Sequence, residues 1–260
     1  MHTSRTIPRT EGDWFWLPDH RPHAAVRLLC FPHAGGDATA FTTLGRLLPE
    51  EIEVWGVRMP GRGGRARDPY PESFEDLVQA VADAALPHLD RPYAVLGQSV
   101  GALVGYEAAR KLSAQLNPTA CFVIGFAPPH TWREPPGSGG EDDARELADF
   151  MLRNDERAGA VVTHPALGEM AQRALLADMG LARTYRDAGT GPLDCPVQPV
   201  LGADDEAVTA GEMAEWKRCF TGSRPLEVVE AGHLVLQSGE AAVRQVGAVV
   251  QDVLLPSLYQ

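Results

Sequence analysis

One short segment, Gly97–Gly101 with the sequence GQSVG, constrains this chain more than any other. The run 93–96 before it is apolar, as in a buried strand, and the apolar residues of 103–108 after it recur with the spacing of a helix. A serine between strand and helix, with glycine two residues away on each side, predicts a sharp turn that presents the Ser99 hydroxyl. Because the chain has 26 glycines among 260 residues, the pattern alone is open to chance, and the flanking strand and helix give it weight.

Strand-like and helix-like segments alternate along the chain, which predicts an α/β fold with a doubly wound, mostly parallel sheet. The expected strands are near-continuous apolar runs, typical of strands buried on both faces, at 26–31, 52–57, 93–96, 121–126, 197–201 and 226–229. The expected helices cover 38–48, 73–86, the stretch after Gly101, 142–155, 166–185, 211–220 and 240–254. Ser73 is a suitable N-cap for the second of these, with Asp76 three residues later.

The organisation of the chain indicates a single domain, 1–260, because this length suits one large α/β unit. Residues 1–11 are expected to form a loose tail, and the aromatic patch 14–18 to pack onto the body and cover the core. The two helices expected between 126 and 197 have no strand between them and follow a Pro- and Gly-rich linker. They predict a helical lid insertion, about 128–190, at the sheet edge where ligands bind; a purely structural insertion is the alternative.

Charge and cysteine content exclude several classes of function. The net charge of −12 argues against nucleic acid and against an anionic membrane surface as partners. The N-terminal region lacks the apolar core of a signal peptide, and no segment approaches the length of a membrane span. The cysteines are scattered without a C-x-x-C pair, which predicts reduced thiols and a cytoplasmic protein; they are Cys30, Cys121, Cys195 and Cys219. We find no zinc motif and expect no metal.

A serine nucleophile needs a base within hydrogen-bond reach, and the base needs an orienting carboxylate. At a turn of this kind the chain order is serine, then acid, then histidine. His233 lies in a glycine-containing loop after the last expected strand, which predicts it as the base. His164 lies in the expected lid, and His130 lies just before the linker.

The acid is expected in the acidic segment 204–206, which follows a late strand. We predict Asp205, with Asp204 as the second choice. A solvated acidic turn is the alternative interpretation, while a calcium loop is not supported because the D-x-D-x-D-G spacing is missing.

Attack on an acyl carbon creates an oxyanion, which backbone N–H groups usually stabilise. One donor comes from the residue after the nucleophile, Val100, and the other from the loop after an early strand. The loop 31–36 occupies that place, so we predict the Ala34 N–H as the second donor. His33 in this loop precedes Ser99 in the chain and is expected to shape the loop rather than to act as a second base.

The segment 58–67 holds the densest cluster of basic residues in an acidic chain, namely Arg58, Arg62, Arg65 and Arg67. Its glycines lack the Gly-Lys-Ser/Thr of a phosphate-binding P-loop, which argues against nucleotide binding. The arginines are suited to steering an acidic carrier protein or its phosphate, and a solvated loop is the alternative.

Taken in register, these motifs resemble the type II thioesterases that accompany polyketide synthases and nonribosomal peptide synthetases. The resemblance extends from about residue 14 to 254. It rests on LLCFPHAGG at 28–36, MPGRG at 59–63, GQSVG at 97–101, ALLAD at 174–178 with Thr184-Tyr185, PLDCPV at 192–197 and AGH at 231–233.

The resemblance implies an α/β-hydrolase fold with a lid and a stand-alone hydrolase without cofactor. Its substrates would be acyl thioesters on the phosphopantetheine arm of an acyl or peptidyl carrier protein, and its task would be to clear stalled or wrong chains. By position, Ser99, Asp205 and His233 would be the catalytic triad, and Ala34 and Val100 the oxyanion hole.

The chain departs from the family pattern at three positions. Gln98 stands where the family usually has histidine, Val100 where it usually has methionine, and Glu206 where it often has proline. These departures leave room for a specialised substrate or for release of a finished chain. The competing hypotheses are a product-releasing hydrolase, a cyclase or an acyltransferase on the same fold, and a catalytically silent binding module.

Overall fold

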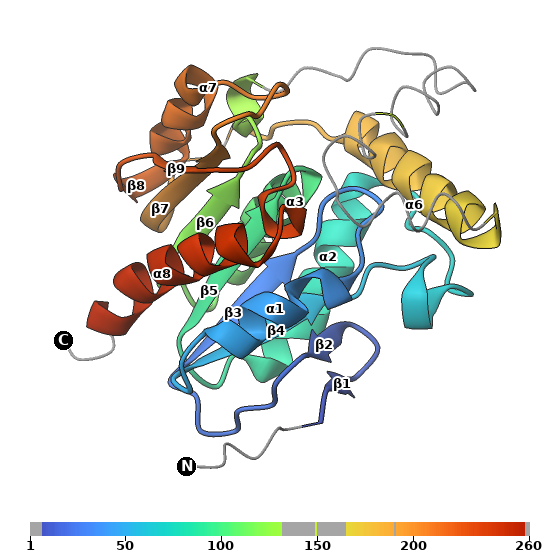
Figure 1. The fold of residues 1–260 in the computed structure, drawn as a ribbon, viewed down its shortest axis with the longest axis horizontal. Helices are drawn as coiled ribbons and strands as arrows, with labels where there is room; N and C mark the ends of the chain where they lie inside the picture. Colours follow the sequence, from blue (N-terminus) through green and yellow to red (C-terminus); the bar gives the residue numbers. More distant parts are fainter. Residues whose placement is uncertain (1–6, 132–148, 150–164, 190, 258–260) are drawn as a thin grey trace.

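The computed structural model describes residues 7–131, 149, 165–189 and 191–257. Nine strands of the described chain form one sheet in the order β1-β2-β4-β3-β5-β6-β7-β8, with β9 also paired to β7 (Figure 1). The strands are β1 (Arg9–Glu11), β2 (Phe15–Leu17), β3 (Val26–Phe31), β4 (Ile52–Val57), β5 (Tyr93–Gln98), β6 (Cys121–Ile124), β7 (Leu193–Gly202), β8 (Phe220–Ser223) and β9 (Glu227–Val229).

The pairs from β4 through β3, β5, β6 and β7 to β8 and β9 are all parallel, which confirms the predicted doubly wound sheet. The antiparallel edge formed by β1 and β2 was not predicted. Part of the expected tail is therefore paired, and the aromatic patch forms a strand whose Phe15 and Leu17 are buried. These two strands have three residues each, which is too short for an alternation of apolar residues to be recognised.

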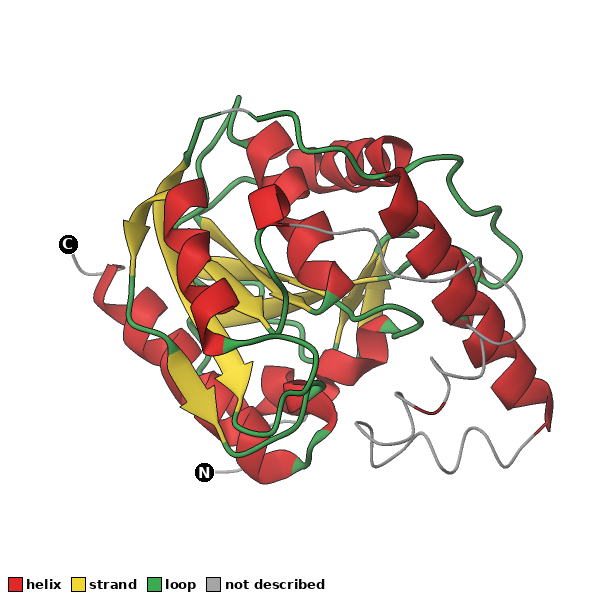
Figure 2. Cartoon of the chain, turned by 90° about the horizontal axis from the view of Figure 1, so that it is seen from above, coloured by secondary structure: helices red, strands yellow, loops and turns green. Residues whose placement is uncertain are grey.

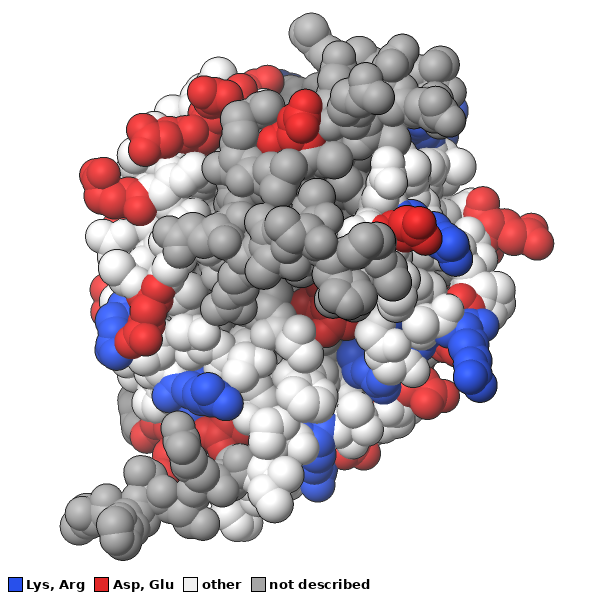
Figure 3. Space-filling model, turned by 45° about the vertical axis from the view of Figure 1, so that its right-hand side comes forward, with Lys and Arg blue, Asp and Glu red and all other residues white. Residues whose placement is uncertain are grey.

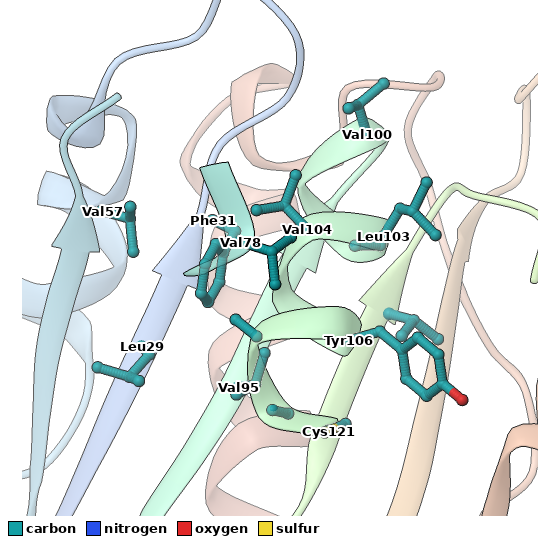
Figure 4. Packing of buried hydrophobic residues seen from close by; sticks show 14 of the residues in the cluster. Leu29, Phe31, Val57, Val78, Val95, Val100, Leu103, Val104, Tyr106 and Cys121 are labelled. Atoms are coloured by element: carbon teal, nitrogen blue, oxygen red, sulfur yellow. The ribbon is translucent and has the colours of Figure 1, made fainter. Parts of the chain in front are cut away.

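Helices cover both faces of the sheet (Figures 1 and 2). Buried residues of α2 and α3 pack on one face, and those of α1 and α8 on the other. Figure 4 shows Leu29, Phe31 and Val95 of the sheet beside Val78 and Val104 of the helices. The helices are α1 (Thr42–Leu47), α2 (Phe74–Ala85), α3 (Val100–Leu112), α6 (Pro165–Thr184), α7 (Ala210–Ala214) and α8 (Glu240–Ser257).

Short 3₁₀ turns complete several helical segments. The expected helix 38–48 begins as η1 (Ala38–Phe41), and the expected helix 211–220 continues after α7 as η5 (Glu215–Cys219). The other turns are η2 (Gly63–Arg65), η3 (Leu86–His88), η4 (Pro129–Thr131) and η6 (Val235–Gln237). Ser73 caps α2 as predicted, because its side chain accepts a hydrogen bond from the Asp76 N–H.

The late part of the chain differs in detail from the expectation. Strand β7 is longer than the predicted 197–201, and the short strand β8 was not predicted. The second expected lid helix is α6, while the first, 142–155, lies outside the described residues apart from 149. Among the described helices, none is long and apolar enough to cross a membrane.

The topology brings three chain segments to one edge of the sheet. Ser99 directly follows β5, Asp205 follows β7 and His233 follows β9. Because these strands are parallel and Gly202 pairs with Val229, their carboxyl ends lie at the same edge. Ligands bind at this edge in open α/β sheets.

Candidate active site

Ser99 lies in a strained turn between β5 and α3. With φ 54° and ψ −134°, it is the only non-glycine of the described chain with a positive φ. Its N–H donates to Ile124 O at 2.8 Å, and its carbonyl accepts from Ala102 N at 2.8 Å, so its own backbone is held on both sides. Strain of this kind is tolerated where surrounding structure enforces it, and such residues cluster at functional sites.

The two glycines of the segment permit this turn because strand and helix pass at close range. A Cβ on Gly97 would lie 2.3 Å from Gly101 O, and a Cβ on Gly101 would lie 2.3 Å from Pro32 O. Any side chain at either position would collide with backbone, which has little freedom to move away. The close approach expected from the sequence is therefore present in the structure.

A hydrogen-bonded chain of three side chains starts at the Ser99 hydroxyl. Ser99 Oγ lies 3.0 Å from His233 Nε2, and His233 Nδ1 lies 2.9 Å and 3.1 Å from the two carboxylate oxygens of Asp205. A carboxylate only accepts hydrogen bonds, so Nδ1 carries the proton and Nε2 is left to accept from the hydroxyl. The His233 and Asp205 side chains are 5% and 0% exposed.

The Asp205 carboxylate is held by its own loop. Its Oδ1 accepts hydrogen bonds from Ala207 N at 2.8 Å and Val208 N at 3.1 Å. The neighbouring Asp204 is exposed, so the structure places the first choice of acid, and not the second, against His233.

The other histidines considered from the sequence are placed elsewhere. His130 lies 3.7 Å from the Cys219 sulfur and 3.8 Å from the Glu215 carboxylate. His164 lies outside the described residues.

The two expected oxyanion donors lie at one narrow, mostly apolar pocket beside the turn that holds Ser99. Ala34 and Val100 are both part of its lining. The rest of the wall comes from the end of β3 and the residue after it, from the loop after β4, from α2, from the start of α3 and from α6. It consists of Phe31, Pro32, Met59, Phe74, Leu77, Gly101, Val104, Asp178 and Leu181. The loop that holds Ala34 and the helix that begins at Val100 therefore face a common space.

A buried ion pair joins this pocket to α6. Arg62 and Asp178 form a two-pronged pair, with Arg62 Nη1 2.6 Å from Asp178 Oδ2, and their side chains are 7% and 5% exposed. The same Oδ2 accepts the Gly35 N–H at 2.7 Å, and Arg62 Nη1 donates to Gly36 O at 3.1 Å. One carboxylate on α6 thus holds both the loop 33–36 and the loop of Arg62.

This pairing removes Arg62 from the arginine cluster predicted to steer a partner or to form a solvated loop, while Arg67 is exposed and the role of the remaining cluster stays a prediction. Arg62 is buried and committed to Asp178. Arg65 stacks on Trp14 with its Cζ 3.9 Å from the ring centroid, and Arg58 Nη1 donates to a backbone carbonyl at 2.9 Å. Figure 3 shows acidic and basic side chains interspersed over one face of the molecule.

His33 is buried in the loop beside the site, where it shapes the backbone. Its carbonyl accepts the Gly36 N–H at 2.9 Å. Burial first, and then the charges of His233 and Arg62, lower the pKa of His33 to about 3. A neutral ring with so low a pKa is a poor base near neutral pH, in keeping with the expected structural role.

Within the described residues, no group of three or more His, Cys, Asp or Glu side chains is arranged to hold a metal ion. The four cysteines are all buried and free. The groups that the described site brings together are a hydroxyl, an imidazole and a carboxylate, beside the pocket lined by Ala34 and Val100.

The model of the thioesterase domain family matches residues 26–251. This chain belongs to the thioesterase family. The thioesterase is 33% identical over 236 residues to the AMB antimetabolite synthetase AmbE of Pseudomonas aeruginosa, a match that covers 90% of this chain but 11% of the synthetase.

Two solved structures are similar over most of their length. One is the RedJ thioesterase from the prodiginine biosynthetic pathway in Streptomyces coelicolor, with 30% identity and a TM-score of 0.82, covering 90% of this thioesterase and 92% of RedJ. The other is the type II thioesterase BorB from the borrelidin biosynthetic cluster, with 26% identity and a TM-score of 0.83, covering 95% and 100%. The expected α/β-hydrolase fold and the family resemblance are thereby confirmed.

Proposed function

We propose that this protein is a stand-alone type II thioesterase that hydrolyses acyl thioesters on the phosphopantetheine arm of an acyl or peptidyl carrier protein. Its task would be to clear stalled or aberrant chains in polyketide or nonribosomal peptide biosynthesis. The observation that carries the proposal is the chain of hydrogen bonds from Ser99 through His233 to Asp205, in a member of the thioesterase family. The similarity to BorB, a type II thioesterase, supports the assignment as type II, and the similarity to both BorB and RedJ supports a role in a biosynthetic pathway.

In this proposal Ser99 is the nucleophile and His233 the general base. As Ser99 Oγ attacks the thioester carbonyl, its proton passes to His233 Nε2, and the N–H groups of Ala34 and Val100 stabilise the oxyanion. The carbon–sulfur bond then breaks, and the thiol leaves with the proton from His233. A water molecule then attacks the acyl-serine carbonyl as His233 takes its proton. The bond between the acyl carbon and Ser99 Oγ breaks, His233 returns the proton to Oγ, and the carboxylic acid is released. Asp205 keeps the imidazole in the required tautomer throughout.

The insertion 128–190 is proposed to act as a lid over this site. Its described helix, α6, contributes Asp178 and Leu181 to the pocket wall, opposite the start of α3. In this proposal Leu181 gives the acyl chain an apolar contact, and closure of the lid excludes water from the reacting thioester.

Release of a finished product is a second candidate function. The observation that favours it is the 33% identity to a segment that makes up 11% of a much longer synthetase, so that a related sequence is part of a synthetase itself. Hydrolysis, cyclisation and transfer all share the acyl-serine step and differ in the acceptor that follows it. Product analysis with carrier-bound acyl chains distinguishes them.

The first prediction tests the nucleophile. Ser99→Ala is expected to fold normally and to lose thioester turnover by several orders of magnitude, since removing one triad member disables the whole unit. Turnover is measured on a panel of acyl thioesters, each offered on carrier protein and on a small-thiol mimic. Ser113→Ala, at the far end of α3, is the matched control and should keep full activity. Undiminished turnover by Ser99→Ala rejects the proposed function.

A further inference from the structure

The residue before the nucleophile makes a side-chain bridge to the segment that carries His233. Gln98 is 1% exposed, and its Oε1 accepts the Leu236 N–H at 2.9 Å. Its Nε2 donates to Gln237 Oε1 at 2.5 Å. Leu236 and Gln237 belong to the turn η6, which begins two residues after His233. One amide thus links the end of β5, directly before Ser99, to the loop that presents the imidazole.

The bridge uses both ends of the amide and has one orientation. A backbone N–H can only donate, so the Gln98 oxygen must face Leu236 and its nitrogen must face the Gln237 oxygen. The nitrogen also lies 3.4 Å from His33 Nδ1, where its second hydrogen points toward the neutral ring. Every polar atom of this buried side chain therefore has a partner, as a rigid buried network requires.

We propose that Gln98 is a positioning residue, whose neutral amide holds the segment 233–237 against β5 and so sets the distance between His233 and Ser99. This inference rests on the proposed function, in which that distance governs proton transfer. In this inference Gln98 acts on the reaction through the position of His233 and is not itself a catalytic residue.

The chemistry of the bridge explains why an amide suits this place. A neutral imidazole also offers one acceptor and one donor, but a protonated one offers two donors and leaves the Leu236 N–H without an acceptor. His33 faces the amide, with its Nδ1 3.4 Å from the Gln98 nitrogen. The amide carries no charge at any pH of interest, so its own donor and acceptor do not change with pH.

The central test compares two buried glutamines. Gln98→Met keeps the length of the side chain and removes both hydrogen bonds. Gln198→Met is the control. Gln198 lies on β7, away from the turn at Ser99, and is 4% exposed. Its Nε2 donates to Pro199 O and Pro225 O, both at 2.9 Å. We expect Gln98→Met to lower kcat roughly 10- to 100-fold with KM nearly unchanged, the scale of a small misplacement of a catalytic group. Gln198→Met should lower the melting temperature similarly while kcat stays within about two-fold.

A second variant tests the pH profile of kcat, which would not change if Gln98 only stabilised the fold. Gln98→His should restore most of the kcat lost in Gln98→Met at alkaline pH, and should lose kcat more steeply than the wild type as the pH falls. The measurement is the pH profile of kcat on a small-thiol acyl thioester, together with the rate of labelling of Ser99 by a fluorophosphonate.

Several outcomes overturn the inference. They are a wild-type kcat in Gln98→Met, an equal loss of kcat in Gln198→Met, or a wild-type pH profile in Gln98→His. If Gln98→Met does not fold, the profile of Gln98→His decides alone. The failure of the proposed function is a separate result, because it would appear as turnover in Ser99→Ala whatever Gln98 does.

Discussion

At the residue scale, two adjacent carboxylates have different surroundings. Asp205 is buried against His233 and accepts two backbone N–H groups, whereas Asp204 is exposed to solvent. We expect Asp205→Asn to lower kcat by about 10⁴, because an amide stabilises the wrong tautomer and the imidazolium poorly. Asp204→Asn serves as the matched control and should change kcat less than two-fold or so. Steady-state kinetics of both variants give the answer, and a larger loss in Asp204→Asn would move the acid by one residue.

The catalytic residues could be predicted from the sequence because they follow strand ends, whereas the contacts of Gln98 and Asp178 could not. Ser99, Asp205 and His233 follow strand ends in a known chain order, so local pattern and topology suffice to place them together. The bridges of Gln98 and Asp178 join residues more than a hundred positions apart, and their existence depends on side-chain packing. The family motif around Asp178 marked the segment, but nothing in its pattern gave the partner.

At the element scale, a buried carboxylate links α6 to two loops of the body, beside the apolar contacts that Leu175 and Leu181 make with the core. Asp178 neutralises Arg62 and also receives the Gly35 N–H of the loop with the proposed oxyanion donor Ala34. Removing the negative charge leaves the Arg62 guanidinium buried and unpaired, which typically costs about 3–5 kcal/mol. We therefore expect Asp178→Asn to reduce the free energy of unfolding by that order and to lower kcat/KM through the displaced loop.

Chemical denaturation and acyl-thioester kinetics test this prediction. Glu169→Gln removes an exposed carboxylate from the same helix and should leave both quantities nearly unchanged. Equal stability of the two variants would show that the buried pair does not hold α6 in place.

Among the elements themselves, those that the sequence missed are short, although the three-residue strand β9 was predicted at 226–229. The long parallel strands and helices were predicted within a few residues because their apolar periods extend over at least one full turn or several alternations. The short strands β1, β2 and β8 were missed, since each has only three or four residues and owes its pairing to a neighbour already in place.

At the scale of the whole molecule, stability depends on a histidine enclosed by three separate segments. His33 follows β3, contacts Gln98 at the end of β5 and is influenced by the charge of His233 beyond β9. Desolvation by burial is the main cause that lowers its pKa from 6.5 to about 3 in the folded protein. The ring can take up a proton in the unfolded chain at a pH where the folded protein excludes it.

The sign of the resulting pH dependence follows from this difference. Above about pH 6.5 neither state is protonated at His33, so the stability due to the neutral buried ring is fully present. As the pH falls toward 3, the unfolded state binds a proton that the folded state does not, and stability is lost. Between pH 8 and pH 5 the loss due to this one residue amounts to about 2 kcal/mol.

A comparison of variants isolates this contribution from the many carboxylates that titrate in the same range. His33→Asn removes the titration, so its stability relative to the wild type should improve by about 2 kcal/mol when the pH is lowered from 8 to 5. His23→Asn, at an exposed position, should show no such change. Urea denaturation of the three proteins at both pH values measures the difference. His33→Asn and the wild type could instead lose stability in parallel. The ring would then take up its proton in the folded protein, or the elements around it would separate enough to hydrate it. In either case the closed packing of the three segments around His33 would have to be abandoned.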